Sequence, residues 1–145
     1  MNYKRFGNTC YARFDRGEEV TECLKTLCEK EGIRLATVQA LGATDNFTVC
    51  VYDTIEKEYH FLDYNTAHEI VSLVGSVNTM NGEYYSHLHM SAANTAGNVV
   101  GGHLKRAVIS ATCEMTIFIT DGTLDRFKDE VTGLNLYRFN GETSV

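Results

Sequence analysis

The sequence predicts an α+β domain in which a largely antiparallel, twisted sheet carries one long N-terminal helix. Apolar residues recur at helical spacing only between Asp15 and Gly32. After Gly32 they alternate with polar residues in short runs that turn signals separate. One helix followed by a series of strands is typical of this fold class. The 145 residues are expected to form a single domain, 1–145.

The helix is predicted to begin after Asp15 and to end at Gly32. The Asp15 carboxylate can accept hydrogen bonds from free backbone N–H groups, and Glu18, three residues later, resembles a capping box. Gly32 is suited to the left-handed conformation that ends many helices. The apolar stripe between them contains Val20, Cys23, Leu24, Leu27 and Cys28.

Strands are expected on both sides of this helix. Asn8–Phe14 mixes Thr, Tyr, Cys and Phe and predicts a strand before it. The period-two runs after it are Ile33–Leu41, Phe47–Tyr52, Glu58–Leu62, Ile70–Val77, Tyr84–Ala92, Val99–Leu104, Cys113–Thr120 and Leu134–Phe139. The turn signals are Asn81-Gly82, Ala96-Gly97-Asn98 and Asp121-Gly122. A short helix at Thr66–Glu69 is an alternative for that segment.

Composition favours a cytoplasmic protein that does not enter membranes. The five cysteines are odd in number, irregularly spaced and without a Cys-x-x-Cys pair, which is typical of reduced thiols. Residues 1–10 have no apolar run of the kind a signal peptide requires. No segment approaches the roughly 20 apolar residues that span a bilayer.

Charge argues against direct binding to duplex DNA. The net charge is −6, whereas duplex-binding domains usually present a basic face to the phosphates. Lys4-Arg5 and Lys105-Arg106 are the only adjacent basic pairs. The chain also has no proline.

Three histidines in the second half of the chain predict a transition-metal site. His87 and His89 are two residues apart, so on a strand their side chains point to the same side of the sheet. A turn centred at Ala96 would place His103 opposite His89 on that same face. Three converging imidazoles favour zinc with an open fourth position, although Ni²⁺ or Fe²⁺ also suits these ligands. The open position would favour water or a small anionic ligand.

Leu88, Met90 and the Gly101-Gly102 pair test the predicted pairing of His89 with His103. Leu88 and Met90 should point away from the histidines, into the core. Gly101-Gly102 has two interpretations: a bulge that reverses the alternation, or room for another backbone or a ligand to come close.

Other polar residues are weaker candidates. Glu114 interrupts an apolar strand and is a candidate general base or a partner of the metal ligands, although a half-exposed carboxylate on an outer face is the alternative. Tyr84 and Tyr85 are candidates for lining a pocket or for packing. His60 and His68 are interpreted as ordinary surface or core histidines.

Several segments together resemble the plants-and-prokaryotes conserved (PPC) domain. They are Phe14–Val20, Gly42-Ala43, Ser72–Val77, Asn81-Gly82, His87–His89 and Val100–Leu104. The resemblance implies a homotrimer, and it implies that His87, His89 and His103 form the family's metal site near subunit contacts. Bacterial members carry a DNA-binding label by association with plant relatives that have AT-hooks. A hook requires an Arg-Gly-Arg-Pro core, which this proline-free chain lacks.

The fold of this family also resembles acetolactate decarboxylase, which holds zinc through a His-x-His pair and a later histidine. Two functions are therefore predicted. The first is a trimeric zinc-binding module with a DNA-associated or regulatory role. The alternative is a zinc-dependent, lyase-like enzyme acting on a small carboxylate or dicarbonyl, because a shared fold does not fix function.

Overall fold

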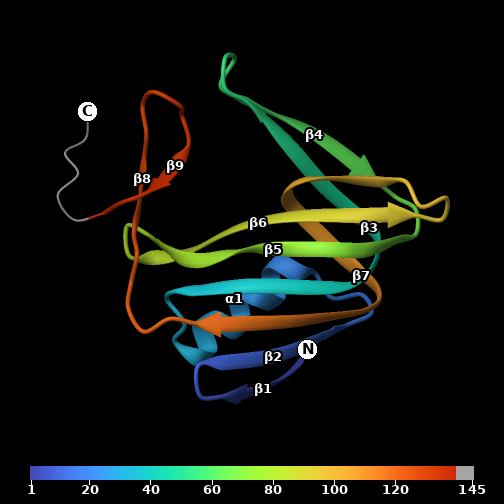
Figure 1. Cartoon of the computed structure of the whole chain (residues 1–145), viewed down its shortest axis with the longest axis horizontal. Coiled ribbons are helices and arrows are strands. Elements are labelled where there is room, and N and C mark those ends of the chain that lie inside the picture. Colours follow the sequence, from blue (N-terminus) through green and yellow to red (C-terminus); the bar gives the residue numbers. More distant parts are fainter. Residues whose placement is uncertain (140–145) are drawn as a thin grey trace.

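The computed structural model describes residues 1–139, which fold mainly into antiparallel strands (Figure 1). The elements are β1 Asn2–Phe6, β2 Thr9–Asp15, α1 Val20–Glu31, β3 Ala36–Asp53, β4 Glu58–Tyr64, β5 His68–Met80, β6 Glu83–Asn94, β7 Val99–Ile119, β8 Arg126–Lys128 and β9 Asn135–Tyr137. Strands β1–β7 form one sheet in the order β1-β2-β7-β6-β5-β3-β4, and β8 pairs with β9. Because β7 also pairs with β3, the strands β3, β5, β6 and β7 close on themselves.

The predicted long N-terminal helix is wrong: α1 has 12 residues, and the fold is dominated by its sheet. Asp15 does not cap the helix. Its backbone N–H donates to the Glu18 carboxylate within a turn that precedes the helix. Glu19 is the actual N-cap, and its side chain accepts from the Glu22 backbone N–H. Gly32, in the left-handed conformation, ends the helix as predicted.

Several predicted strands join into two long, bent ones. Ile33–Leu41 and Phe47–Tyr52 fall largely within β3. Val99–Leu104 falls within β7, and so does Cys113–Thr120 except for its last residue. Register shifts between β3 and β7 bend both strands without breaking them. Gly42 permits the bend, because a Cβ atom there would lie 2.3 Å from the Thr112 carbonyl oxygen.

Two smaller differences separate the structure from the predicted elements. β1 was not predicted, because its sequence is mostly polar and lacks alternation. The alternative short helix at Thr66–Glu69 does not form, since β5 already begins at His68. No helix among residues 1–139 has the length and apolarity needed to cross a membrane.

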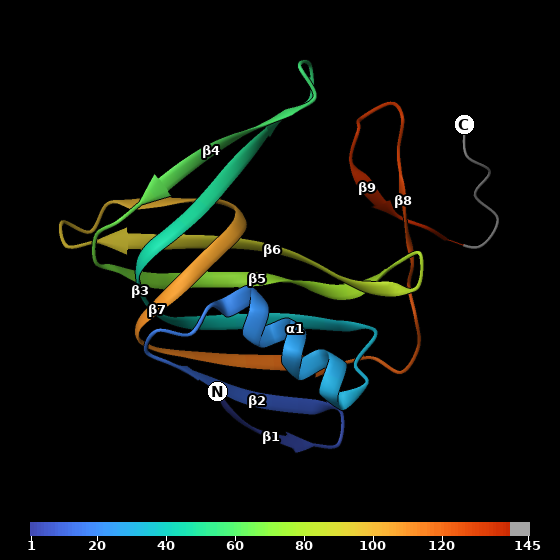
Figure 2. The ribbon, with the colours of Figure 1, turned by 180° about the vertical axis from the view of Figure 1, so that it is seen from behind.

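The helix covers only one face of the sheet (Figure 2). Its buried residues Val20, Leu24, Leu27 and Cys28 join a core made from the inward-facing residues of the strands. On the opposite face, large apolar side chains are solvent-exposed, notably Tyr11, Leu41, Val74 and Phe118. This uncovered face also carries His87 and His89, because Val74 pairs directly with His89 and Ser76 with His87.

Gly75 is expected to be essential for the pairing of β5 with β6. A Cβ atom at this position would lie 2.1 Å from the His87 carbonyl oxygen and 2.8 Å from Leu88 Cδ2. We therefore expect Gly75→Ala to lower the free energy of unfolding by about 3 kcal/mol, since the two backbones must move apart. Denaturant unfolding measures this loss. Ser72→Ala, at an exposed position of the same strand, is the control and should change stability by less than about 0.5 kcal/mol; equal stabilities for the two variants would contradict the expectation.

Candidate metal centre

The hairpin of β6 and β7 has the register predicted from the sequence. His89 pairs directly with His103, and the pairing continues to Ala93 and Val99. Asn94 closes the turn, because its side-chain oxygen accepts from the backbone N–H groups of Ala96 and Asn98. The hairpin thus fixes the positions from which the three imidazoles project.

The imidazoles of His87, His89 and His103 converge on one point. Their candidate ligand atoms all lie within 4.8 Å of one another. The Nε2 atoms of His87 and His89 are 3.2 Å apart. A tetrahedral zinc ion with Zn–N bonds of about 2.05 Å separates two ligand nitrogens by about 3.3 Å. The donor set and its spacing therefore fit a metal ion.

Side chains alternate between the two faces of the sheet around the site, so Gly101-Gly102 serves to let a neighbouring backbone come close and does not form a bulge. Leu88 and Met90 are buried in the core as predicted. No register shift occurs between β6 and β7, so Gly101-Gly102 is not a bulge in that ladder. Instead a Cβ atom on Gly101 would lie 2.5 Å from the Met90 carbonyl oxygen, and one on Gly102 would lie 2.7 Å from that of Cys50. The glycines allow the neighbouring backbones to come close.

Burial keeps two of the imidazoles in the neutral form that ligates metals. Burial is the main reason that the pKa of His103 falls to about 4, and the neighbouring His87, His89 and Lys105 lower it further. Burial also lowers the pKa of His87, with smaller contributions from His89 and Arg126. At neutral pH these rings carry free lone pairs, so metal binding does not have to compete with protons.

The low pKa of His103 predicts an acid-dependent stability for the metal-free protein. The unfolded chain protonates this ring below about pH 6.5, whereas the folded protein resists protonation until about pH 4. The free energy of unfolding should therefore fall as the pH drops through this interval, by at most about 3 kcal/mol from His103 alone. Denaturant unfolding of the metal-free His103→Gln variant should show a smaller fall, while the exposed-site control His60→Gln should behave as wild type. Equal pH dependence in all three proteins would refute the prediction.

The histidines lie in a pocket of about 430 Å³. Its other lining residues are mainly aromatic or apolar, with Arg126 as the charged group: Cys50, Val51, Tyr52, Tyr59, Tyr85, Gly102, Arg126, Leu134, Asn135, Leu136 and Tyr137. Among the described residues that line it there is no carboxylate. The one grouping of metal-ligating side chains found in residues 1–139 contains these three histidines and no fourth protein ligand. The arrangement leaves a coordination position open toward the pocket.

A family model for the Plants and Prokaryotes Conserved (PCC) domain matches residues 1–121. The chain belongs to this family. The match confirms the resemblance predicted from the sequence and includes all three histidines.

Solved structures agree with the PCC-domain assignment. A candidate DNA-binding protein from Bacteroides thetaiotaomicron is 25% identical, with a TM-score of 0.93 over 95% of this chain and 96% of its own. A metal-containing protein from Archaeoglobus fulgidus is 28% identical, with a TM-score of 0.85 over 96% and 99% of the two chains. Acetolactate decarboxylase from Bacillus subtilis shares the fold alone, at 13% identity and a TM-score of 0.56 over 80% of this chain and 54% of that one. No curated protein matches the sequence.

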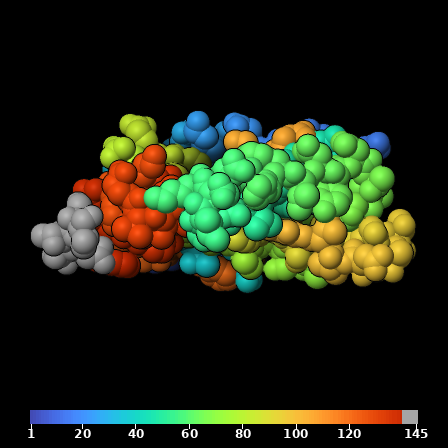
Figure 3. Space-filling model, turned by 90° about the horizontal axis from the view of Figure 1, so that it is seen from above, coloured from blue at the N-terminus to red at the C-terminus, as the bar shows by residue number. Residues whose placement is uncertain are grey.

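The pocket wall opposite the histidines comes from outside the PCC-domain match. The β8–β9 hairpin lies beyond residue 121 and closes over the pocket. The Tyr52 hydroxyl donates to the Thr132 carbonyl at 2.8 Å, and Lys57 Nζ donates to that of Glu130 at 2.9 Å. Figure 3 shows the red C-terminal segment packed against the green segment around the β3–β4 turn.

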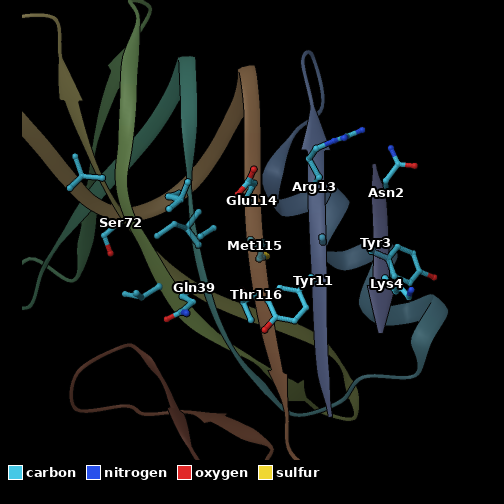
Figure 4. Close-up of a pocket in the computed structure, with 16 residues that line it drawn as sticks. Asn2, Tyr3, Lys4, Tyr11, Arg13, Gln39, Ser72, Glu114, Met115 and Thr116 are labelled. Carbon is cyan, nitrogen blue, oxygen red and sulfur yellow. The ribbon is translucent and has the colours of Figure 1, made fainter. Parts of the chain in front are cut away.

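The structure does not bring Glu114 to the histidines. Glu114 lines a separate pocket of about 780 Å³ on the uncovered sheet face, together with Tyr11 and Gln39 (Figure 4). It pairs with Leu41 of β3, and β5 lies between β3 and the histidine strand β6. Two strands, β3 and β5, thus separate Glu114 from the histidine strand on this face, and Glu114 does not line the histidine pocket.

The remaining histidines agree with their interpretation as ordinary residues. His60 is exposed on β4. His68 is buried, and its Nδ1 lies 2.7 Å from the Thr66 carbonyl oxygen. Its ring also contacts Phe47 edge-on, with centroids 5.0 Å apart. Both lie outside the metal-ligating group.

Sequence reasoning missed most of the pocket wall. Tyr59 and Tyr137 line the pocket, and the Tyr59 ring lies 5.7 Å from that of His103. Arg126 was missed because it follows a turn and its neighbours are remote in sequence. Tyr85 was named as a candidate lining residue, and it does line the pocket.

Proposed function

We propose that this chain is a trimeric, zinc-binding PCC-domain protein of a single domain, with a DNA-associated or regulatory role in the cytoplasm. The observation that carries the proposal is the convergence of His87, His89 and His103 at an open pocket. The five cysteines, all without disulfides, are consistent with a reducing compartment.

Zinc is the metal that this donor set favours. Three neutral imidazoles leave the full double charge of the ion in place, and a vacant position would accept water or an anion. Nickel and iron accept the same ligands, so the metal bound in the cell follows from availability as well as from geometry. A related structure is that of a metal-containing protein, which supports the proposal.

The uncovered sheet face supports the homotrimer. A row of directly paired residues, Tyr11, Thr116, Gln39, Val74 and His89, crosses five strands on this face. Exposed apolar residues on and beside this row, such as Leu41 and Phe118, form a surface of the kind that subunit contacts cover. Because the row ends at His89, such a contact would lie beside the metal site.

A regulatory role would involve DNA through a partner protein. Two related structures are of candidate DNA-binding proteins. This chain, however, has a net charge of −6, which disfavours binding to phosphates, and without proline its sequence contains no AT-hook core.

Measuring how the metal-loaded protein binds an A·T-rich duplex at 50 and 200 mM salt tests whether the chain contacts DNA directly. We expect no measurable affinity, or a nearly flat dependence on salt. A steep fall in affinity with salt would show phosphate contacts and would replace the indirect role with direct binding.

The alternative is a zinc-dependent enzyme acting on a small carboxylate or dicarbonyl. The open pocket beside the histidines favours it, because a purely structural metal site is closed by a fourth protein ligand. A bound zinc would polarise a substrate oxygen as a Lewis acid. No carboxylate among the described residues reaches the pocket, so proton transfer would require water or a tyrosine. Turnover of such compounds by the metal-loaded protein, absent in His89→Ala, would establish this alternative.

A further inference from the structure

Arg126 is a buried cation without a counterion. The residue is only 4% exposed, and it lines the pocket of the three histidines. No carboxylate within residues 1–139 forms an ion pair with its guanidinium, whose acceptors are neutral; from Arg126, the Asp125 carboxylate accepts only the backbone N–H. Nε donates to the Asn78 side-chain oxygen at 3.2 Å, and Nη1 donates to the Asn135 carbonyl at 2.6 Å.

Aromatic rings hold the guanidinium in place. Its central carbon lies 4.2 Å from the centroid of Tyr137 and 4.9 Å from that of Tyr85. Two of the five guanidinium N–H groups donate to Asn78 and Asn135. The other three have no acceptor in the part of the chain that the structure describes. The group is therefore rigidly positioned and retains donors for a further contact.

The contacts of these two tyrosines place Arg126 beside the histidines. Tyr85 is two residues before His87 on β6, so both side chains lie on the same face of the strand. The Tyr137 hydroxyl donates to Ser76 Oγ at 2.8 Å, and Ser76 is the residue directly paired with His87. The guanidinium and the imidazoles thus line the same pocket.

An unpaired buried charge is unfavourable, and an anion in the pocket would compensate it. Removing a guanidinium from water costs free energy that hydrogen bonds to neutral acceptors offset only in part. A metal ion held by three neutral imidazoles also retains a net positive charge. Two centres of positive charge therefore face a small pocket that has no negative side chain among its lining residues.

We propose that Arg126 and the metal of the histidine cluster together bind a small carboxylate that has a second oxygen donor. The inference rests on the proposed metal site. One oxygen of the ligand occupies the open coordination position, and the carboxylate accepts hydrogen bonds from Arg126. The volume of about 430 Å³ limits the ligand to a compact molecule, and the tyrosines and leucines around it accommodate a short apolar substituent.

The β8–β9 hairpin would then determine ligand choice. Arg126, Asn135 and Tyr137 all lie beyond residue 121, where the family match ends, while the histidines lie inside it. The proposed anion contact is therefore a property of this C-terminal hairpin and not of the region that defines the family.

Binding of glycolate to the Co²⁺-loaded protein tests the proposal without any assay of activity. Cobalt in the zinc site gives a visible spectrum that changes when a ligand enters its coordination shell. Glycolate carries a carboxylate and a second oxygen, and ethylene glycol is its uncharged analogue. We expect wild-type protein to bind glycolate with saturation, and ethylene glycol at least about 10-fold more weakly.

Arg126→Met is expected to weaken glycolate binding by about 10- to 100-fold, the effect of losing a hydrogen bond to a charged group. Arg126→Lys keeps the charge and much of the packing, so it serves if the methionine variant fails to fold; it should weaken binding less. Arg138→Met is the matched control, because Arg138 lies on the same hairpin but is exposed and outside the pocket.

The outcomes separate the two claims. If wild-type protein binds no Co²⁺, the proposed metal site fails. If all variants bind Co²⁺ with equal stoichiometry and glycolate with equal affinity, the metal site stands and the role of Arg126 is refuted. Tighter binding of inorganic phosphate than of glycolate would likewise overturn the assignment to a carboxylate.

Discussion

Replacing His89 with alanine is expected to lower metal affinity by at least about 100-fold. Loss of a residue that only supports a ligand typically costs 10- to 100-fold, and His89 is proposed to contact the ion directly. The fold should remain intact, because the His89 side chain is exposed and the core lies on the other face of β6. Competition with a chromogenic chelator measures the affinity.

His60→Ala is the matched control, since it removes an exposed histidine from β4. It should retain the affinity and stoichiometry of wild type. The metal-free His89→Ala protein should unfold within about 0.5 kcal/mol of metal-free wild type. Equal metal occupancy in His89→Ala and wild type would remove His89 from the ligand set.

Replacing Leu41 with glutamate should dissociate the proposed trimer into monomers. Leu41 is 58% exposed on the uncovered sheet face and pairs with Glu114 of β7. If Leu41 lies in a subunit contact, the new carboxylate would be buried there beside the Glu114 carboxylate. Burying this added negative charge costs several kcal/mol per subunit. Sedimentation should give three times the 16.2 kDa chain mass for wild type and the single-chain mass for the variant.

Val131→Glu is the control for this experiment. Val131 is 71% exposed at the loop between β8 and β9, away from the uncovered sheet face. It should sediment as wild type does. A wild-type protein that sediments as a monomer, or a Leu41→Glu variant with unchanged mass, would contradict a trimer built on this face.

The histidine hairpin could be predicted because its information is local. A period of two and a turn centred at Ala96 are sufficient to oppose His89 and His103, and the structure has that pairing. The length of the helix could not be predicted from its start signal. Glu18 contacts the Asp15 backbone N–H as a capping box would, but this contact closes a turn, and Glu19 caps the helix.

The rest of the site depends on contacts between residues remote in sequence. Arg126 reaches Asn78 across 48 positions, and Tyr137 reaches Ser76 across 61. No periodicity or spacing encodes such contacts. Glu114 was named because a charge interrupts an apolar strand, yet that position faces the uncovered sheet surface, where an exposed carboxylate is ordinary.

The most direct test of the metal site is an anomalous difference map from crystals of the metal-loaded protein, collected above and below the absorption edge of the bound metal. The proposed site predicts one strong peak within about 2.0–2.2 Å of one ring nitrogen from each of His87, His89 and His103. A peak elsewhere, or fully occupied metal with these three rings uncoordinated, would contradict it.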